Sequence, residues 1–108
     1  MVKSLSFTVL MSLVLQFPTS ASAEPNTARQ AQLQYLLAQD CGSCHGMRLK
    51  GGLGPALLPE ALRDKPDELL VSTILNGRPG TPMPPWRELL TEDEVRWLVS
   101  VLRSGGKP

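Results

Sequence analysis

The sequence predicts an all-α fold with three main helices. Three segments repeat apolar residues at intervals of three or four, the period of an amphipathic helix: 27–39, 66–76 and 92–104. Two stretches rich in glycine and proline, 46–59 and 77–86, lie between them. No segment shows the strict alternation of a half-buried β-strand. A chain of 108 residues has room for one domain at most.

Residues 1–23 are expected to be a secretory signal peptide rather than part of the fold. Lys3 provides a positive start, residues 5–17 are mostly apolar, and Ala21-Ser22-Ala23 is a typical cleavage site. Cleavage after Ala23 would leave a mature domain, residues 24–108, in the periplasm. The apolar run is too short and too polar for a comfortable membrane span. We therefore expect no stable membrane insertion of the mature chain; retention of the leader as an anchor is the alternative.

The first helix is expected at about 27–39, with Asn26 or Thr27 as its N-cap. Its apolar face is assigned to Ala28, Ala31, Tyr35 and the pair Leu36 and Leu37, which recur at helical spacing. Small Ala31 and Tyr35, one turn apart, would let another helix approach closely.

The next stretch, Cys41-Gly42-Ser43-Cys44-His45, contains both cysteines and the only histidine of the chain. This C-x-x-C-H spacing is the attachment signature of c-type haem. Cys41 and Cys44 can each form a thioether with a vinyl group of the haem, and His45 then lies where its imidazole can bind the iron. The sequence therefore predicts one covalently bound haem c.

Three other interpretations of this motif fit the sequence less well. A thioredoxin-like dithiol would follow a strand in a βαβ pattern, and no strand precedes Cys41. A structural zinc site needs about four ligands, and only three candidates are present. A plain disulfide would leave His45 without a role. Haem would also supply an apolar centre that a mature domain of this size lacks.

Past the motif, residues 46–59 are expected to form an ordered loop around the haem edge, followed by a short helical turn over 60–64. The middle helix is expected to begin with Pro66 at its first position and to end at Gly77. Its apolar set is Leu69, Leu70, Ile74 and Leu75.

The loop at 77–86 is stiffened by four prolines and contains Met83 in its middle. A Met/His pair is the usual electron-transfer ligation of haem iron. Met47 lies too near His45 to reach the other face of the haem, so Met83 is the expected sixth ligand, with flexible core filler as the alternative role.

The last helix begins with a capping box, Thr91 and Glu94, and ends at Gly105. Its apolar face is formed by the residues Val95, Leu98, Val99 and Leu102, with Trp97 on or near it.

These features together resemble a class I monohaem cytochrome c of the small bacterial type. The resemblance rests on Cys41–His45, the Gly54-Pro55 pair, Met83-Pro84 and the two terminal helices. It implies that the first and last helices cross, with Ala31 and Tyr35 opposite Trp97, around one haem held in a crevice between two loops. It also implies that the carbonyl of Pro55 accepts a hydrogen bond from His45, which fixes the imidazole.

More narrowly, CGSCHGMRLKGGLGPAL and NGRPGTPMPPW are similar to the cytochrome c55X group. That group is associated with dissimilatory nitrite reduction by the haem c/haem d1 nitrite reductase. The resemblance implies electron delivery in the periplasm to that enzyme, or to the proteins that mature its haem d1. It implies no catalysis by the chain itself.

Further site residues and partners are less constrained. Arg78 and Trp86 are candidates for contacts with haem propionates. Without Lys3 the charges balance, which argues against nucleic acid as a partner. Four basic residues could dock an acidic partner, although a mixed solvated surface is the simpler role for each: Lys50, Arg63, Lys65 and Arg87. If Met83 is labile, the alternative function is binding of nitric oxide, peroxide or carbon monoxide at an open iron.

Overall fold

The computed structural model describes residues 17–18 and 23–106. Within these residues the chain is helical and contains no β-strand, which confirms the predicted all-α class. The elements, in order, are α1 Thr27–Leu36, the π-helical turn η1 Leu37–Cys41, α2 Gly42–His45, α3 Pro59–Leu62, α4 Asp67–Asn76 and α5 Glu92–Arg103.

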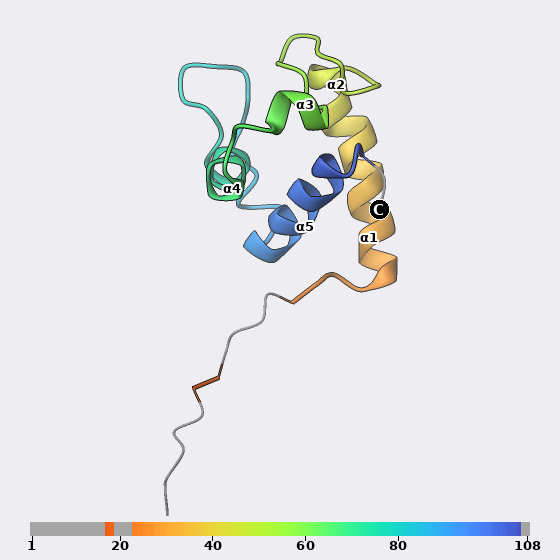
Figure 1. The fold of residues 1–108 in the computed structure, drawn as a ribbon, viewed down its shortest axis with the longest axis vertical. Coiled ribbons are helices and arrows are strands. Elements are labelled where there is room, and N and C mark those ends of the chain that lie inside the picture. Colours follow the sequence, from red (N-terminus) through yellow and green to blue (C-terminus); the bar gives the residue numbers. More distant parts are fainter. Residues whose placement is uncertain (1–16, 19–22, 107–108) are drawn as a thin grey trace, which may run out of the picture.

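The elements α1, η1 and α2 form one continuous rod, and α5 lies between this rod and α4 (Figure 1). The rod and α5 both begin at the lower end of the molecule in this view. The upper end carries α2 and the two loops rich in glycine and proline, 46–58 and 77–86. The two loops that hold the candidate haem residues therefore lie at one end of the helical body.

The core is built around α5, whose apolar side chains are buried on several sides. Among the described residues, twelve hydrophobic side chains are buried in one cluster: Leu33, Leu37, Leu62, Val71, Leu75, Leu90, Val95, Trp97, Leu98, Val99, Val101 and Leu102. The predicted apolar face of the last helix is therefore confirmed, and Val101 adds to it. The capping box is also present, because Thr91 Oγ1 accepts from the backbone N–H of Glu94 while Glu94 accepts from that of Thr91.

The predicted apolar face of the first helix is right for Leu36 and Leu37, which pack in or against the core, and wrong for Ala28, Ala31 and Tyr35. Ala31 is exposed and Tyr35 is 70% exposed, whereas Leu33 and Leu37 are buried. Burying a leucine removes far more apolar surface from water than burying an alanine, so the Leu33 and Leu37 pair determines which side of the rod faces the core. The expected crossing through Ala31 and Tyr35 does not occur.

The helical rod also ends later than expected. Asn26 is the N-cap, with its side chain accepting from the backbone N–H of Arg29. The helix does not stop near Gln39 but continues through a π-helical turn to His45, and Gly46 ends it at φ 92°.

The middle helix differs from expectation in two details. Pro66 is the N-cap of α4 rather than its first helical residue. Val71 is buried in place of Leu69, which is 52% exposed. The stop at Gly77 and the short helix before Lys65 are as predicted.

Ion pairs join the three long helices. Arg29 on α1 binds Glu94 on α5 at 2.6 Å. Arg96 on α5 binds the carboxylate of Glu68 on α4 through its two terminal guanidinium nitrogens, Nη1 and Nη2. These pairs fix α1 and α4 on opposite sides of α5.

The expected leader lies almost wholly outside the described residues. Among the residues that the structure describes, no helix is both long and apolar enough to cross a membrane.

Candidate haem-attachment site

The C-x-x-C-H motif lies on the last turns of the helical rod. Cys41 ends the π-helical turn, and Cys44 and His45 follow on α2. A π-turn inserts one extra residue into a helix and is frequent at functional sites, because it changes which side chains share a face. Here it directly precedes the motif.

Both thiols are free and half-buried. Burial raises the pKa of the Cys41 thiol to about 11, and the charge of Asp40 raises it further. The attacking cysteine of a thiol–disulfide exchanger has a lowered pKa instead. Within the described residues, no three side chains of the metal-binding kinds converge. These observations favour haem attachment over the dithiol and zinc alternatives.

The loop over residues 46–58 holds His45 from one side. The Nδ1 atom of His45 lies 2.7 Å from the carbonyl oxygen of Pro55. This distance makes Nδ1 the donor and leaves Nε2 as the nitrogen free to bind a metal. The loop is tied to the motif by backbone bonds: Gly54 donates to the carbonyl of Cys44, and Gly51 to that of His45. The loop is thus ordered, as expected.

Gly54 makes room for the imidazole. A Cβ at this position would lie 2.8 Å from Nδ1 and Cε1 of His45, closer than carbon atoms approach. Only glycine therefore fits between Pro55 and the ring. The Gly54-Pro55 pair was noted in the sequence, but this steric role depends on the folded loop and was not foreseen.

In the loop over residues 77–86, the half-buried Met83 is held by two local features, the backbone of Gly77 and the hydroxyl of Thr81. Gly77 has φ 66°, a backbone conformation that favours glycine. A Cβ at this position would lie 2.8 Å from the carbonyl oxygen of Met83 and 2.7 Å from the backbone nitrogen of Pro85, so the close approach also requires glycine. The hydroxyl of Thr81 donates to the carbonyl of Arg78 at 2.6 Å and accepts from the backbone N–H of Met83 at 3.3 Å. Sequence reasoning missed Thr81, although a threonine two residues before the bonded N–H is a common turn signal.

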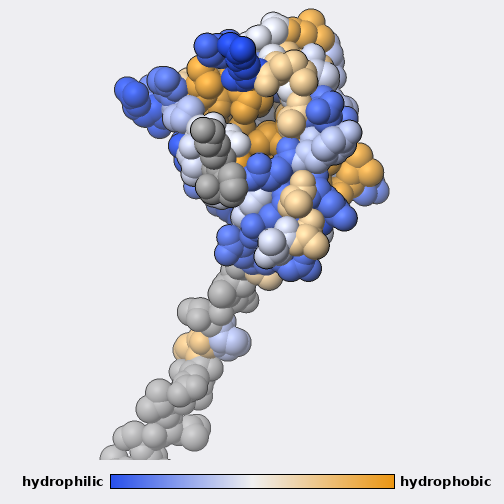
Figure 2. Space-filling view, turned by 90° about the vertical axis from the view of Figure 1, so that its right-hand side faces the viewer, coloured by the Kyte–Doolittle hydropathy of each residue, from blue (hydrophilic) through white to orange (hydrophobic). Residues whose placement is uncertain are grey.

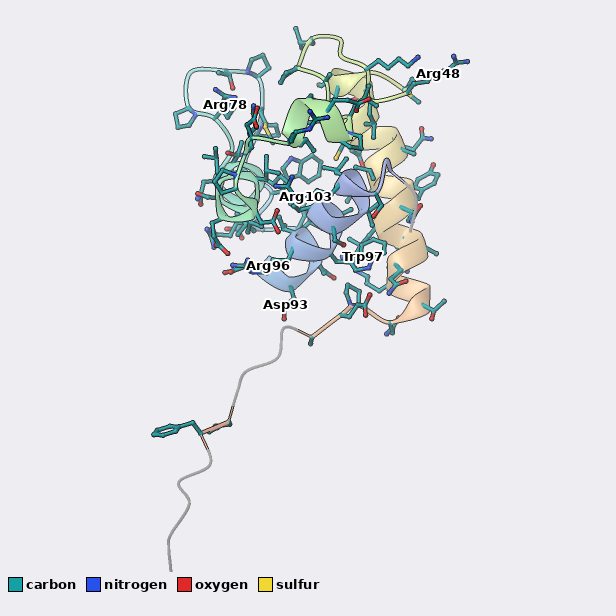
Figure 3. All side chains as sticks on the ribbon, viewed as in Figure 1. Arg48, Arg78, Asp93, Arg96, Trp97 and Arg103 are labelled. Carbon is teal, nitrogen blue, oxygen red and sulfur yellow. The ribbon has the colours of Figure 1, made fainter. Side chains whose placement is uncertain are left out.

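The remaining candidates lie on the same loop. Arg78 is exposed near the upper end of the molecule (Figure 3), and Trp86 is partly buried against the core. The backbone N–H of Trp86 donates to the carbonyl of Ile74, which anchors the far end of the loop to α4. Their contacts with propionates stay predictions.

The residues present fit a covalently held haem. Two free thiols stand one helical turn apart, and the imidazole beside them has one nitrogen engaged and the other free. A glycine provides the space that the ring occupies. An all-helical fold with such a site defines a c-type cytochrome of class I.

Comparison with known proteins agrees with this class. Residues 28–100 match the family model described as cytochrome C oxidase, cbb3-type, subunit III. The chain is 57% identical over 107 residues to cytochrome c55X of Pseudomonas aeruginosa, covering 95% of this chain and 90% of that protein. A solved structure of the c-type cytochrome NirC aligns with TM-score 0.75 and 65% identity, over 78% of this chain and 100% of NirC. The chain belongs to the cytochrome c55X family, and this membership implies one covalently bound haem c.

A third relative is much longer. The dihydro-heme d1 dehydrogenase of Pseudomonas aeruginosa is 38% identical over 94 residues, which are 86% of this chain but only 18% of that protein. The enzyme named dihydro-heme d1 dehydrogenase thus contains a segment similar to this chain.

Proposed function

We propose that the chain is a periplasmic carrier of single electrons, with His45 and Met83 as axial ligands of one haem c bound through Cys41 and Cys44. Bound haem supplies the one-electron iron couple. The observation that carries the proposal is the imidazole of His45, held by Pro55 through Nδ1 and leaving Nε2 free. Other residues position these ligands. Gly54 leaves space for the imidazole of His45, and Gly77 and Thr81 hold the loop that carries Met83.

The proposed redox partner is the haem c/haem d1 nitrite reductase, as electron acceptor, or the enzymes that mature its haem d1. Two findings support this choice: the likeness of both loops to the c55X group, and the cytochrome-like segment within a dihydro-haem d1 dehydrogenase. The expected leader, cleaved after Ala23, would carry the protein to the periplasm, where such partners reside.

Methionine ligation is tested with Met83→Ala in the purified holoprotein. The ferric wild type should show a methionine-to-iron charge-transfer band, which the variant should lack. The variant should also have a lower reduction potential and bind added cyanide or nitric oxide, because a thioether raises the potential and blocks the sixth position. Met47→Ala is the matched control and should leave the band intact, since Met47 is 68% exposed beside the motif. A wild type without the band would favour the alternative of a labile sixth ligand.

The redox partner is tested by stopped-flow mixing with the holoprotein. Oxidised haem c/d1 nitrite reductase is mixed with the reduced holoprotein, and oxidation of the cytochrome is followed. The dehydrogenase instead removes electrons from dihydro-haem d1, so it is mixed together with dihydro-haem d1 and the oxidised holoprotein, and reduction of the cytochrome is followed. Fast oxidation by the reductase supports electron supply to nitrite reduction, and fast reduction by the dehydrogenase supports a role in haem d1 maturation. If neither reaction is faster than the same reaction with an unrelated cytochrome, both partners are contradicted.

A further inference from the structure

One residue other than glycine has a left-handed backbone in the described part of the chain. Leu49 has φ 57°, whereas every other described residue with positive φ is a glycine, including Gly46 and Gly51 on either side of it. A left-handed backbone brings the Cβ of a leucine too close to the following carbonyl oxygen, a cost that glycine does not incur. Such strain persists only where surrounding contacts hold it. The leucine at this position therefore indicates a role for its side chain.

The side chain of Leu49 anchors the loop over residues 46–58 to the helical core. Within this loop, Leu49 and Leu57 pack against the buried hydrophobic cluster. Met47 and Leu53 are instead 68% and 76% exposed. Figure 2 shows hydrophobic groups among hydrophilic ones at the upper end of the molecule, where this loop lies. Leu49 and Leu57 thus provide the apolar contacts of the loop with the core, while the other two side chains face solvent.

Leu49 also covers the C-terminal turn of α5, which runs toward the upper end of the molecule (Figure 1). There Gly105 donates to the carbonyl of Leu102 at 3.0 Å. Gly106 donates to the carbonyl of Val101 at 2.9 Å. This pattern is a Schellman motif, in which the second residue past the cap often makes an apolar contact with the last turn. Gly106 has no side chain for such a contact, and a Cβ there would lie 3.4 Å from Cδ1 of Leu49. A methyl group of the loop therefore lies beside this position.

The backbone of Leu49 connects this anchor to His45. Its N–H donates to the carbonyl of Gly46, the residue after His45, at 2.8 Å. Its carbonyl accepts from the N–H of Leu57 at 2.9 Å. Leu57 lies two residues after Pro55, whose carbonyl oxygen is 2.7 Å from Nδ1 of His45. Leu49 thus joins the two arms of the loop, one on each side of the hydrogen bond that orients the imidazole.

We propose that Leu49 is a positioning residue for His45. Its anchored side chain and left-handed backbone hold the carbonyl of Pro55 against Nδ1, and so set the basicity of the imidazole and the reduction potential of the haem. Donation from Nδ1 makes the imidazole a stronger ligand, which favours ferric iron, so a weaker bond raises the potential. The proposal rests on the proposed function, because it requires His45 to bind the iron.

Two substitutions in the purified holoprotein separate the side chain of Leu49 from its backbone. Leu49→Met keeps an apolar chain against the core, whereas Leu49→Asn suits a left-handed backbone but loses the apolar contact. Solvent exchange of the Nδ1 proton of His45, followed by NMR of the ferrous protein, reports the bond to Pro55, and redox titration gives the potential. Leu49→Met should resemble the wild type in both. Leu49→Asn should exchange this proton roughly tenfold faster and have a raised potential.

Two control variants separate positioning from a general loss of stability. Leu53→Ala shortens an exposed side chain of the same loop and should change neither the exchange rate nor the potential. Val71→Ala shortens a buried side chain on α4 and should lower stability without changing the potential. If Leu49→Asn speeds exchange but keeps the wild-type potential, as Val71→Ala should, Leu49 is a packing residue and the proposal is wrong. It is also wrong if Leu49→Asn resembles the wild type and Leu49→Met does not, because backbone preference then decides.

Failure of this proposal and failure of the proposed ligation give different results. If Leu49→Asn leaves proton exchange and potential unchanged while Met83→Ala loses the methionine–iron band, the ligation stands and Leu49 does not position His45. If Met83→Ala keeps its band while Leu49→Asn speeds exchange and raises the potential, the positioning of His45 stands and the methionine ligand is wrong.

Discussion

The imidazole of His45 packs directly against the backbone of Gly54, and the substitution Gly54→Ala, which adds one methyl group, tests this contact. In Gly54→Ala the added Cβ would meet the imidazole at 2.8 Å, so the ring must move away from Pro55. We expect the free energy of unfolding of the holoprotein to fall by about 1–3 kcal/mol, as for other overpacked sites. Denaturant titration measures it.

The control for that substitution is Gly42→Ala. Gly42 is also buried, within the motif itself, but a Cβ there would make ordinary contacts, the nearest at 3.5 Å to the sulfur of Met47. Alanine also favours a helix over glycine. Equal losses of stability in the two variants would mean that the space beside His45 has no special role.

At the residue scale, the sequence predicts which residues attach the haem better than it predicts which residues pack against them. Cys41, Cys44 and His45 are recognisable because haem attachment requires a fixed local spacing. The role of Gly54 depends on the His45 ring, which lies opposite it only after the loop has closed, and no local spacing encodes that contact. The role of Thr81 has a local turn signal, which sequence reasoning missed.

At the scale of the loops, Thr81 is the residue that holds Met83. Thr81→Val removes a hydroxyl that bonds the Met83 N–H and the Arg78 carbonyl, at a cost of about 1 kcal/mol. If Met83 is the ligand, it should then leave the iron more readily as pH rises. We expect the pH midpoint for loss of the methionine–iron band to fall by about 0.7 unit, the equivalent of that energy.

Thr81→Ser is the matched variant, because it keeps the hydroxyl and should keep the wild-type midpoint. An unchanged midpoint in Thr81→Val would show that the prolines alone hold the loop.

At the scale of the helices, Glu94 joins α1 to α5 and caps α5. Arg29 lowers the pKa of the Glu94 carboxyl, chiefly through their hydrogen bond, so folding favours the ionised form. The stability from this pair is present above the ordinary carboxyl pKa and is lost as pH falls through the lowered value. Glu94→Gln should therefore cost about 0.5–1 kcal/mol at pH 7 and less at pH 3.

Urea unfolding at both pH values checks this, with Glu88→Gln as control. Glu88 is exposed and forms no ion pair in the part of the chain that the structure describes, so its substitution should matter at neither pH. A Glu94→Gln deficit that persists undiminished at pH 3 would point to lost packing rather than lost charge.

Helix ends were easier to predict than helix faces. Thr91, Glu94 and Gly77 act through neighbouring backbone groups, so their capping roles follow from local sequence. The face of α1 was ambiguous because two sets of residues share its period, one of alanines with Tyr35 and one of leucines. Packing against α5 selects the set that buries more apolar surface. The continuation through η1 also lacks a local signal, since no helix breaker precedes Gly46 apart from Gly42.

At the scale of the whole molecule, the buried core and the candidate site occupy different regions. No member of the buried hydrophobic cluster comes from residues 42–61 or 76–89, which are the regions of the two loops. The helices thus contribute the apolar core, while the loops are ordered by hydrogen bonds, mostly of the backbone, and by partial burial. A bound haem would supply the apolar contacts that these loops otherwise lack.

This division predicts how the protein behaves without haem. In Cys41→Ser/Cys44→Ser, which cannot form thioethers, amide hydrogens of residues 46–58 and 77–85 should exchange at least tenfold faster than in the holoprotein. Amides of α5 should keep measurable protection, because Val95, Leu98 and Val99 remain buried among themselves and their neighbours. Hydrogen exchange followed by mass spectrometry resolves the segments. Equal acceleration in α5 and the loops would show instead that haem and helical core fold as one cooperative unit, with no part stable alone.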